Sequence, residues 1–246
     1  MAKALMARLD RLLANLGYGS RKDVQALVAA GKVVLDGKVL KDAGARIAVD
    51  ATLPERMTIR GVAVDPPAPL VLIMHKPLGV TCSHKEDGQK IYDLLPRRWQ
   101  IRDPGLSTVG RLDKDTSGLI LITDDGDFLH RVISPKRHVP KTYLATLDRQ
   151  LAGSEGELFA AGTLMLDGEE KPLLPAQLDV VDAKTARLTI TEGRYHQVRR
   201  MFAAVGNHVV ALHREQIGGL TLPEDLEPGQ HRILPAAEAE KVFADA

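Results

Sequence analysis

The chain has 246 residues with a net charge of +1, of which 44% are hydrophobic and 26% are charged. This composition predicts a globular protein with one large domain, or with a small and a medium domain. The longest aliphatic runs, residues 69–74 and 119–122, are far shorter than the roughly 20 residues of a membrane helix. Cys82 is the single cysteine, which excludes an internal disulfide framework. We therefore expect a cytoplasmic protein with no membrane partner and no cysteine-based metal cluster.

Residues 1–62 predict two helices followed by a hairpin. In the first helix, residues 8–17, Leu9, Leu12, Leu13 and Leu16 share one face. The second helix begins at Ser20 in a sequence that resembles a capping box, and the pair Asp36-Gly37 is typical of a type I′ hairpin turn. Because the apolar faces pack inward, we expect a set of basic side chains to project outward: Arg8, Arg11, Arg21, Lys22 and Lys32.

Basic charge is concentrated at the start of the chain, where residues 1–60 contain 11 Lys and Arg against 6 Asp and Glu. Tyr18 is the one aromatic residue near these cations, so base stacking is not the expected mode of binding. Cations without stacking platforms suit phosphates and RNA shape. A basic face that is merely solvated is the alternative interpretation. The pattern resembles the S4 RNA-binding domain, a small module of the αL type.

Three prolines within residues 61–70 favour extended backbone and mark a boundary. We predict an S4-like domain at residues 1–62, a linker at 63–69 and a catalytic domain at 70–246. Strand patterns in the third segment alternate with helical patterns at residues 127–134 and about 195–205. They predict an α+β fold with a mostly antiparallel mixed sheet flanked by helices.

Three stretches of the second domain carry side chains suited to chemistry. GRLDKDTSGL places Asp113 and Asp115 directly before a buried strand, although these residues also form ordinary turns. KTYLATL places Tyr143 within a strand, where a core aromatic is the alternative. GRYHQVRRMF predicts a helix with His196, Arg199 and Arg200 along one basic edge. The alternative is that this edge is only a solvated helix face.

Together these stretches, with the following LHREQIGGLTL, resemble the bacterial ribosomal RNA pseudouridine synthases of the RsuA group over nearly the whole chain. The resemblance implies that Asp113 is the catalytic residue, that Arg199 pairs with it and that Tyr143 lies against a flipped base. Arg111 then fills the gap left by the flipped nucleotide, and Lys141 and Arg194 bind phosphates. For Lys141 and Arg194 the alternative is a solvated surface side chain with no RNA contact. The further RNA-binding side chains expected are His196, Arg200, Arg8, Arg21 and Lys22.

The expected reaction converts a uridine to pseudouridine in 16S ribosomal RNA, free or in a small-subunit assembly particle, of the type at position 516. It breaks the N1–C1′ bond and joins C5 to C1′ without redox change, so we expect no cofactor and no metal. Asp113 acts either as a nucleophile or as a base towards the ribose. A monomer is expected. The alternatives are a sibling enzyme acting on 23S RNA, a non-catalytic S4-domain assembly factor, and a glycosidase that uses Asp113 and Asp115.

Overall fold

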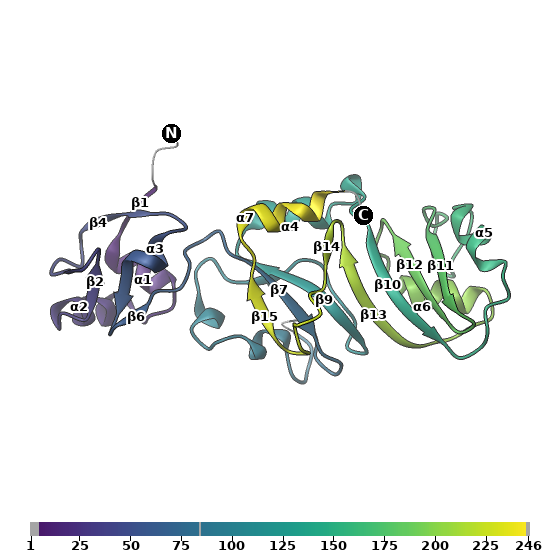
Figure 1. Ribbon diagram of the computed structural model, residues 1–246, viewed down its shortest axis with the longest axis horizontal. Helices are drawn as coiled ribbons and strands as arrows, with labels where there is room; N and C mark the ends of the chain where they lie inside the picture. The colour runs from purple at the N-terminus through teal and green to yellow at the C-terminus, as the bar shows by residue number, and fades with distance from the viewer. Residues whose placement is uncertain (1–4, 84, 245–246) are drawn as a thin grey trace. The chain divides into compact units, whose positions relative to one another are not determined.

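The computed structural model describes residues 5–83 and 85–244, which divide into two compact units (Figure 1). The first unit comprises Met1–Leu70, Leu95–Ser107 and Thr123–Asp125, and the second comprises Val71–Leu94, Thr108–Ile122 and Gly126–Ala246. The first unit therefore extends beyond the expected 1–62 domain and takes in two segments from later in the chain. No helix within the described residues is long and apolar enough to span a membrane.

The first unit contains the predicted order of two helices and a hairpin, with short additional strands. Its elements are β1 (Leu5–Arg8), α1 (Leu9–Asn15), α2 (Arg21–Ala29), β2 (Val33–Leu35), β3 (Lys38–Val39), β4 (Arg46–Val49), α3 (Leu53–Arg56), β5 (Met57–Ile59), β6 (Val62–Ala63) and the 3₁₀ turn η2 (Trp99–Ile101). Strand β1 was not predicted, and it pairs antiparallel with β4.

Local signals explain these elements. Ser20 caps α2 through a reciprocal box with Asp23, an arrangement of about 1 kcal/mol. Asp36 and Gly37 both have positive φ, at 48° and 75°, as a type I′ turn requires. The predicted leucine face of α1 is buried in the core of this unit together with Val24 and Val28 of α2.

In the second unit nine strands, among the residues described, form one sheet in the order β11-β12-β10-β13-β9-β7-β15, with β14 beside β13 and β8 beside β9. The strands are β7 (Val71–Lys76), β8 (Ser107–Thr108), β9 (Thr116–Thr123), β10 (Lys141–Leu147), β11 (Gln177–Asp182), β12 (Thr185–Ile190), β13 (Val209–Ile217), β14 (Leu220–Thr221) and β15 (His231–Ile233). Strands β9 and β13 run parallel, whereas β10 is antiparallel to both β12 and β13. The α+β fold with a mostly antiparallel mixed sheet is thus confirmed.

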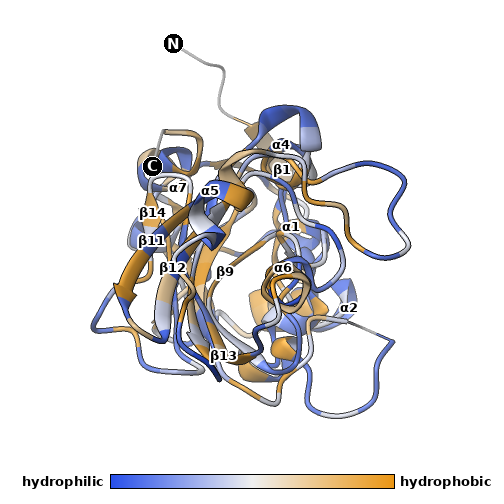
Figure 2. Ribbon diagram, turned by 90° about the vertical axis from the view of Figure 1, so that its right-hand side faces the viewer, coloured by the Kyte–Doolittle hydropathy of each residue, from blue (hydrophilic) through white to orange (hydrophobic). Residues whose placement is uncertain are grey.

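Helices accompany this sheet as expected. They are α4 (Gly126–Ile133), α5 (Glu155–Ala160), α6 (Gln197–Ala204) and α7 (Ala236–Ala239), with the 3₁₀ turns η1 (Ile91–Leu94), η3 (Pro135–Arg137) and η4 (Glu240–Phe243). Figure 1 shows α4 beside α7, and Phe128 of α4 forms an edge-to-face pair with Phe243 of η4. Figure 2 shows hydrophobic residues along β9, whose Leu119–Ile122 segment is fully buried.

Candidate active site

Asp113 lies in a tight turn directly before β9. Its carbonyl oxygen accepts a hydrogen bond from the Thr116 amide at 3.1 Å, so the chain reverses around Asp115 before the strand begins. The Asp113 side chain is 36% exposed, and its Oδ1 lies 3.4 Å from Nε2 of His196. The turn therefore holds the carboxylate at the N-terminal end of an inner strand of the sheet, open to a ligand and facing an imidazole.

His196 reaches Asp113 because α6 begins later than the sequence predicted. His196 has a left-handed backbone with φ of 48° and stands just before Gln197, the first helical residue. Its ring stacks on Tyr195, with ring centroids 3.9 Å apart and an interplanar angle of 15°. Tyr195 itself is 76% exposed, so an aromatic pair borders the carboxylate on the solvent side.

Arg199 does not pair with Asp113, and that expectation is wrong in this structure. Its Nη2 lies 2.9 Å from the carboxylate of Asp115 and also donates to the Asp115 carbonyl at 3.1 Å. Nη1 donates to the Val209 carbonyl at 2.8 Å. Because the turn separates the two carboxylates, a guanidinium anchored at the start of β13 meets Asp115. Arg199 thus fastens the turn to α6 and β13.

Tyr143 lies on β10 opposite Arg214 of β13, a residue that the sequence analysis did not single out. The tyrosine is 8% exposed, so most of its ring is already covered by protein. The Arg214 guanidinium lies 5.8 Å from the ring centroid, and its Nη1 is 3.4 Å from the hydroxyl. Arg214 could have been found in the LHRE stretch, since it lies two residues after Leu212 and therefore shares its inward face of the strand.

Lys76 at the end of β7 and the partly buried Lys141 at the start of β10 add positive charge to the same sheet. Lys76, which sequence reasoning also missed, is fully buried and donates to the Thr116 and Pro77 carbonyls at 2.8 and 3.0 Å. Burial lowers the pKa of Lys76, while the charges of Asp113 and Asp115 oppose that effect. Lys141 donates to the Val139 carbonyl at 2.8 Å. Burial, aided by the charge of Arg214, lowers the pKa of Lys141 to about 8.

The sequence profile of a family described as RNA pseudouridylate synthase matches residues 70–204, and that of the S4 domain matches residues 7–53. The chain belongs to the RNA pseudouridylate synthase family. It is therefore an enzyme, an RNA pseudouridine synthase with an N-terminal S4 domain.

Full-length relatives support this assignment. The synthase is 42% identical over 244 residues to the ribosomal small subunit pseudouridine synthase A of Escherichia coli K12, covering 96% of this chain and 99% of that protein. An uncharacterized RNA pseudouridine synthase of Bacillus subtilis is 41% identical over 234 residues, covering 94% and 96%. A crystal structure of a pseudouridylate synthase matches with a TM-score of 0.67 and 37% identity, covering 96% of this chain and 99% of that one.

Three of the expected RNA-binding arginines of the synthase are engaged by acidic residues. Arg111 is 67% exposed and lies 2.6 Å from Glu86. Arg194 and Arg200 both pair with Glu169, at 3.1 and 2.9 Å. They also donate to carbonyls within residues 167–172, so their guanidinium groups anchor that loop to α6. The structure does not bring Arg194 or Arg200 into an ion pair with Asp113.

In the N-terminal unit, Arg8 and Arg21 converge on Asp10. Their guanidinium groups lie 3.1 and 2.8 Å from its carboxylate, which is completely covered, whereas both arginines remain more than half exposed. Their hydrogen bonds hold the pKa of Asp10 well below its usual range. The two cations therefore link α1 to α2 and still face solvent. Lys22 is exposed beside them.

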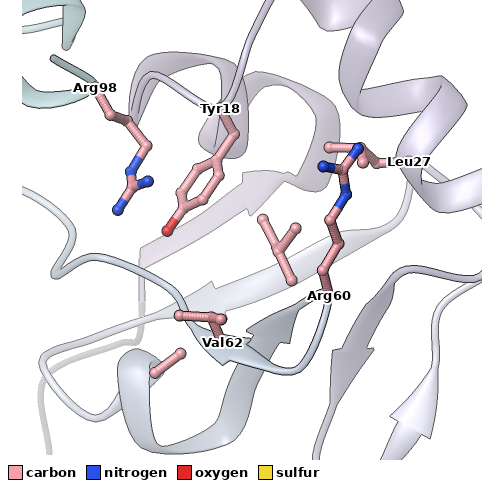
Figure 3. Close-up of a pocket in the computed structure, with 7 residues that line it drawn as sticks. Tyr18, Leu27, Arg60, Val62 and Arg98 are labelled. Atoms are coloured by element: carbon pink, nitrogen blue, oxygen red, sulfur yellow. The ribbon is translucent and has the colours of Figure 1, made fainter.

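A shallow pocket of about 310 Å³ opens in the same unit (Figure 3). Tyr18 lies near its centre, with the Arg98 guanidinium 4.6 Å from the ring centroid. Arg98 also pairs with Asp65, whose amide donates to the Tyr18 hydroxyl at 2.9 Å. These contacts tie Tyr18 to residues 65 and 98 of the same unit.

Proposed function

We propose that this synthase converts one uridine of 16S ribosomal RNA to pseudouridine, of the type at position 516, with Asp113 as the catalytic residue. The name of the Escherichia coli relative, a small-subunit enzyme 42% identical over nearly the full length, supports the choice of RNA. The relative from Bacillus subtilis, at 41% identity, is nearly as similar, but its name specifies RNA without saying which one. The position of the target uridine therefore needs its own test.

The observation that carries the role of Asp113 is its position. Its carboxylate is open to a ligand, whereas the neighbouring Asp115 is tied to Arg199. Asp113 can therefore reach a ribose, either to attack C1′ or to remove a ribose proton. Breaking the N1–C1′ bond then frees the uracil, which turns and is rejoined through C5. Atoms and electrons balance within the nucleotide, so the chemistry calls for no cofactor or metal.

The target uridine must leave its stack to meet Asp113. Extrusion costs a few kcal/mol, and stacking on an aromatic ring returns roughly 1 to 3 kcal/mol. Tyr143 is the proposed contact for the base, although its 8% exposure means that the base meets the rim of the ring and its hydroxyl. Tyr195, exposed beside His196, offers a second ring at the solvent side of the same carboxylate.

The test is to map pseudouridines in ribosomal RNA from cells that lack the synthase, by carbodiimide-stop sequencing. Each pseudouridine gives one stop in the sequencing read. The expected result is that one stop in 16S RNA is lost and that the wild-type gene restores it. Loss of a stop in 23S RNA instead would identify the sibling specificity, and no change in either RNA would refute an rRNA target.

Three variants test the role of Asp113. Asp113→Asn should fail to restore the stop while binding the RNA within a few-fold of wild type. Asp225→Asn, an exposed carboxylate paired with Arg232, is the matched control and should restore it. Asp115→Asn should give partial restoration, because Arg199 keeps its bond to the Asp115 carbonyl. Activity of Asp113→Asn equal to the control would remove Asp113 from the mechanism.

A further inference from the structure

Arg214 is fixed against the strand that carries the catalytic turn. Residues Leu212–Arg214 of β13 pair in parallel with Thr116–Gly118 of β9. Gly118 has φ of 113°, and a Cβ built there would lie 2.3 Å from the carbonyl oxygen of Arg214. Glycine at this position therefore allows the two backbones to approach closely. On its other side Arg214 faces Tyr143 of β10.

The guanidinium of Arg214 is buried with unmet hydrogen-bonding capacity. The residue is 2% exposed. Its Nε donates to the Leu119 carbonyl at 2.8 Å and its Nη1 lies 3.4 Å from the Tyr143 hydroxyl. Nη2 is buried and has no hydrogen-bond partner among the described residues. An arginine keeps its charge in a protein, so it cannot relieve this situation by losing a proton.

Neighbouring charges increase the excess of positive charge. Burial, and to a lesser extent the charge of Arg214, lowers the pKa of both Lys76 and Lys141, so each lysine lies within electrostatic range of Arg214. Among the ion pairs of the described residues, none joins Arg214 to a carboxylate. A buried cation without an acidic partner is costly to the fold. Such a group is expected where a ligand supplies the missing negative charge.

We propose that Arg214 is a further functional residue of the synthase, a role that rests on the proposed function. Its Nη1 positions the Tyr143 hydroxyl, and its Nη2 donates to a carbonyl oxygen of the uracil. By either route for Asp113, the N1–C1′ bonding electrons leave with the uracil. The negative charge is shared between N1 and the carbonyl oxygens until C5 bonds to C1′, C5 loses its proton and N1 gains one. A fixed donor in a dry site stabilises that charge.

The test compares RNA that carries the target uridine with RNA that has an abasic ribose at the same position. The RNA sequence is the one identified by mapping, so an error in the 16S assignment does not affect the outcome. Asp113→Asn serves as the parent protein to prevent turnover. This parent protein should bind the uridine RNA at least about 10-fold more tightly than the abasic RNA. Adding Arg214→Lys or Arg214→Gln to it should remove most of that difference in affinity.

Arg187→Lys is the matched control, because Arg187 lies on β12 of the same sheet, separated from β13 by β10, and pairs with Glu215 at the surface. It should keep the ratio. If Arg214 had only a structural role, its replacement would instead weaken the binding of both RNAs by the same factor. With Asp113 intact, Arg214→Lys should lower the single-turnover rate constant about 100-fold at saturating RNA. Retention of the uridine-to-abasic ratio in Arg214→Lys would overturn the proposal.

A second measurement needs no change at Arg214. Sulfur accepts hydrogen bonds more weakly than oxygen, so RNA with 2-thiouridine or 4-thiouridine at the target should bind the same parent protein less tightly for one of the two substitutions. Unaltered affinity for both would overturn the uracil contact. Turnover by Asp113→Asn during these measurements would count against the role of Asp113 alone, which keeps the two failures distinct.

Discussion

Lys141 gives a quantitative test of the electrostatics around the site. Burial lowers the pKa of Lys141 from 10.5 to about 8. At about 1.36 kcal/mol for each pKa unit, this depression corresponds to at most about 3.4 kcal/mol of lost stability at neutral pH. Solvent still reaches part of the side chain, and its bond to the Val139 carbonyl returns some energy. We therefore expect Lys141→Met, which keeps the length and removes the charge, to recover about 1–2 kcal/mol.

The sign of the pH dependence follows from the direction of the pKa change. Below pH 8 the ammonium is charged in both the native and the unfolded state, so its full cost is present. Between pH 8 and pH 10.5 the native state loses its proton while the unfolded state retains it, so wild-type stability rises with pH. Above that window the cost is gone, and the advantage of Lys141→Met over wild type should disappear.

Urea unfolding of the full chain, followed by circular dichroism across this pH range, measures the effect. Differences between variant and wild type cancel the titration of the other groups. Lys184→Met is the matched control, because the exposed Lys184 also donates to a backbone carbonyl, that of Asp148 at 2.8 Å. An advantage of Lys141→Met that is equal at neutral and alkaline pH, or a loss of stability at neutral pH, would refute the reasoning.

Three other outcomes are expected. Removing Arg21 and Lys22 together should weaken RNA binding and reduce by about two the slope of log affinity against log salt concentration. An unchanged slope would mean that the S4 domain does not bind the RNA phosphates. Gly118→Ala should destabilise the chain and lower activity together, because its Cβ would collide with the Arg214 backbone. A melting temperature equal to wild type would contradict that. Metal chelation should leave turnover of prefolded RNA intact, and strict metal dependence would contradict the isomerisation scheme.

The local parts of the fold could be predicted because short-range chemistry determines them. Ser20 and Asp23 are three residues apart and form the capping box by themselves. Asp36 and Gly37 are adjacent residues that both adopt the positive φ of the predicted turn. The alternation of Tyr143 within β10 is likewise local. In such cases backbone preference and hydrophobic pattern agree, so sequence and structure lead to the same element.

The ion-pair partners could not be predicted, since they join distant parts of the chain. Glu169 binds Arg194 and Arg200 from 25 and 31 residues away, so these side chains hold a loop, and their contacts with phosphate stay predictions. The start of α6 also depended on tertiary contacts. A left-handed residue is uncommon outside glycine, and nothing in the local sequence marks His196 for that backbone. Its φ of 48° shortens the predicted helix and turns the imidazole towards Asp113.

The positive charge beside Asp113 comes from other residues than the one expected, and this division suits the chemistry. A guanidinium that held Asp113 in two hydrogen bonds would occupy the lone pairs needed for attack. Arg199 instead binds Asp115 and fixes the turn. Lys76 supplies positive charge from beneath, with its own hydrogen bonds directed to carbonyls. Orientation and charge are thus provided by separate cations, which leaves the Asp113 oxygens free of a guanidinium, as the proposed contact with a ribose requires.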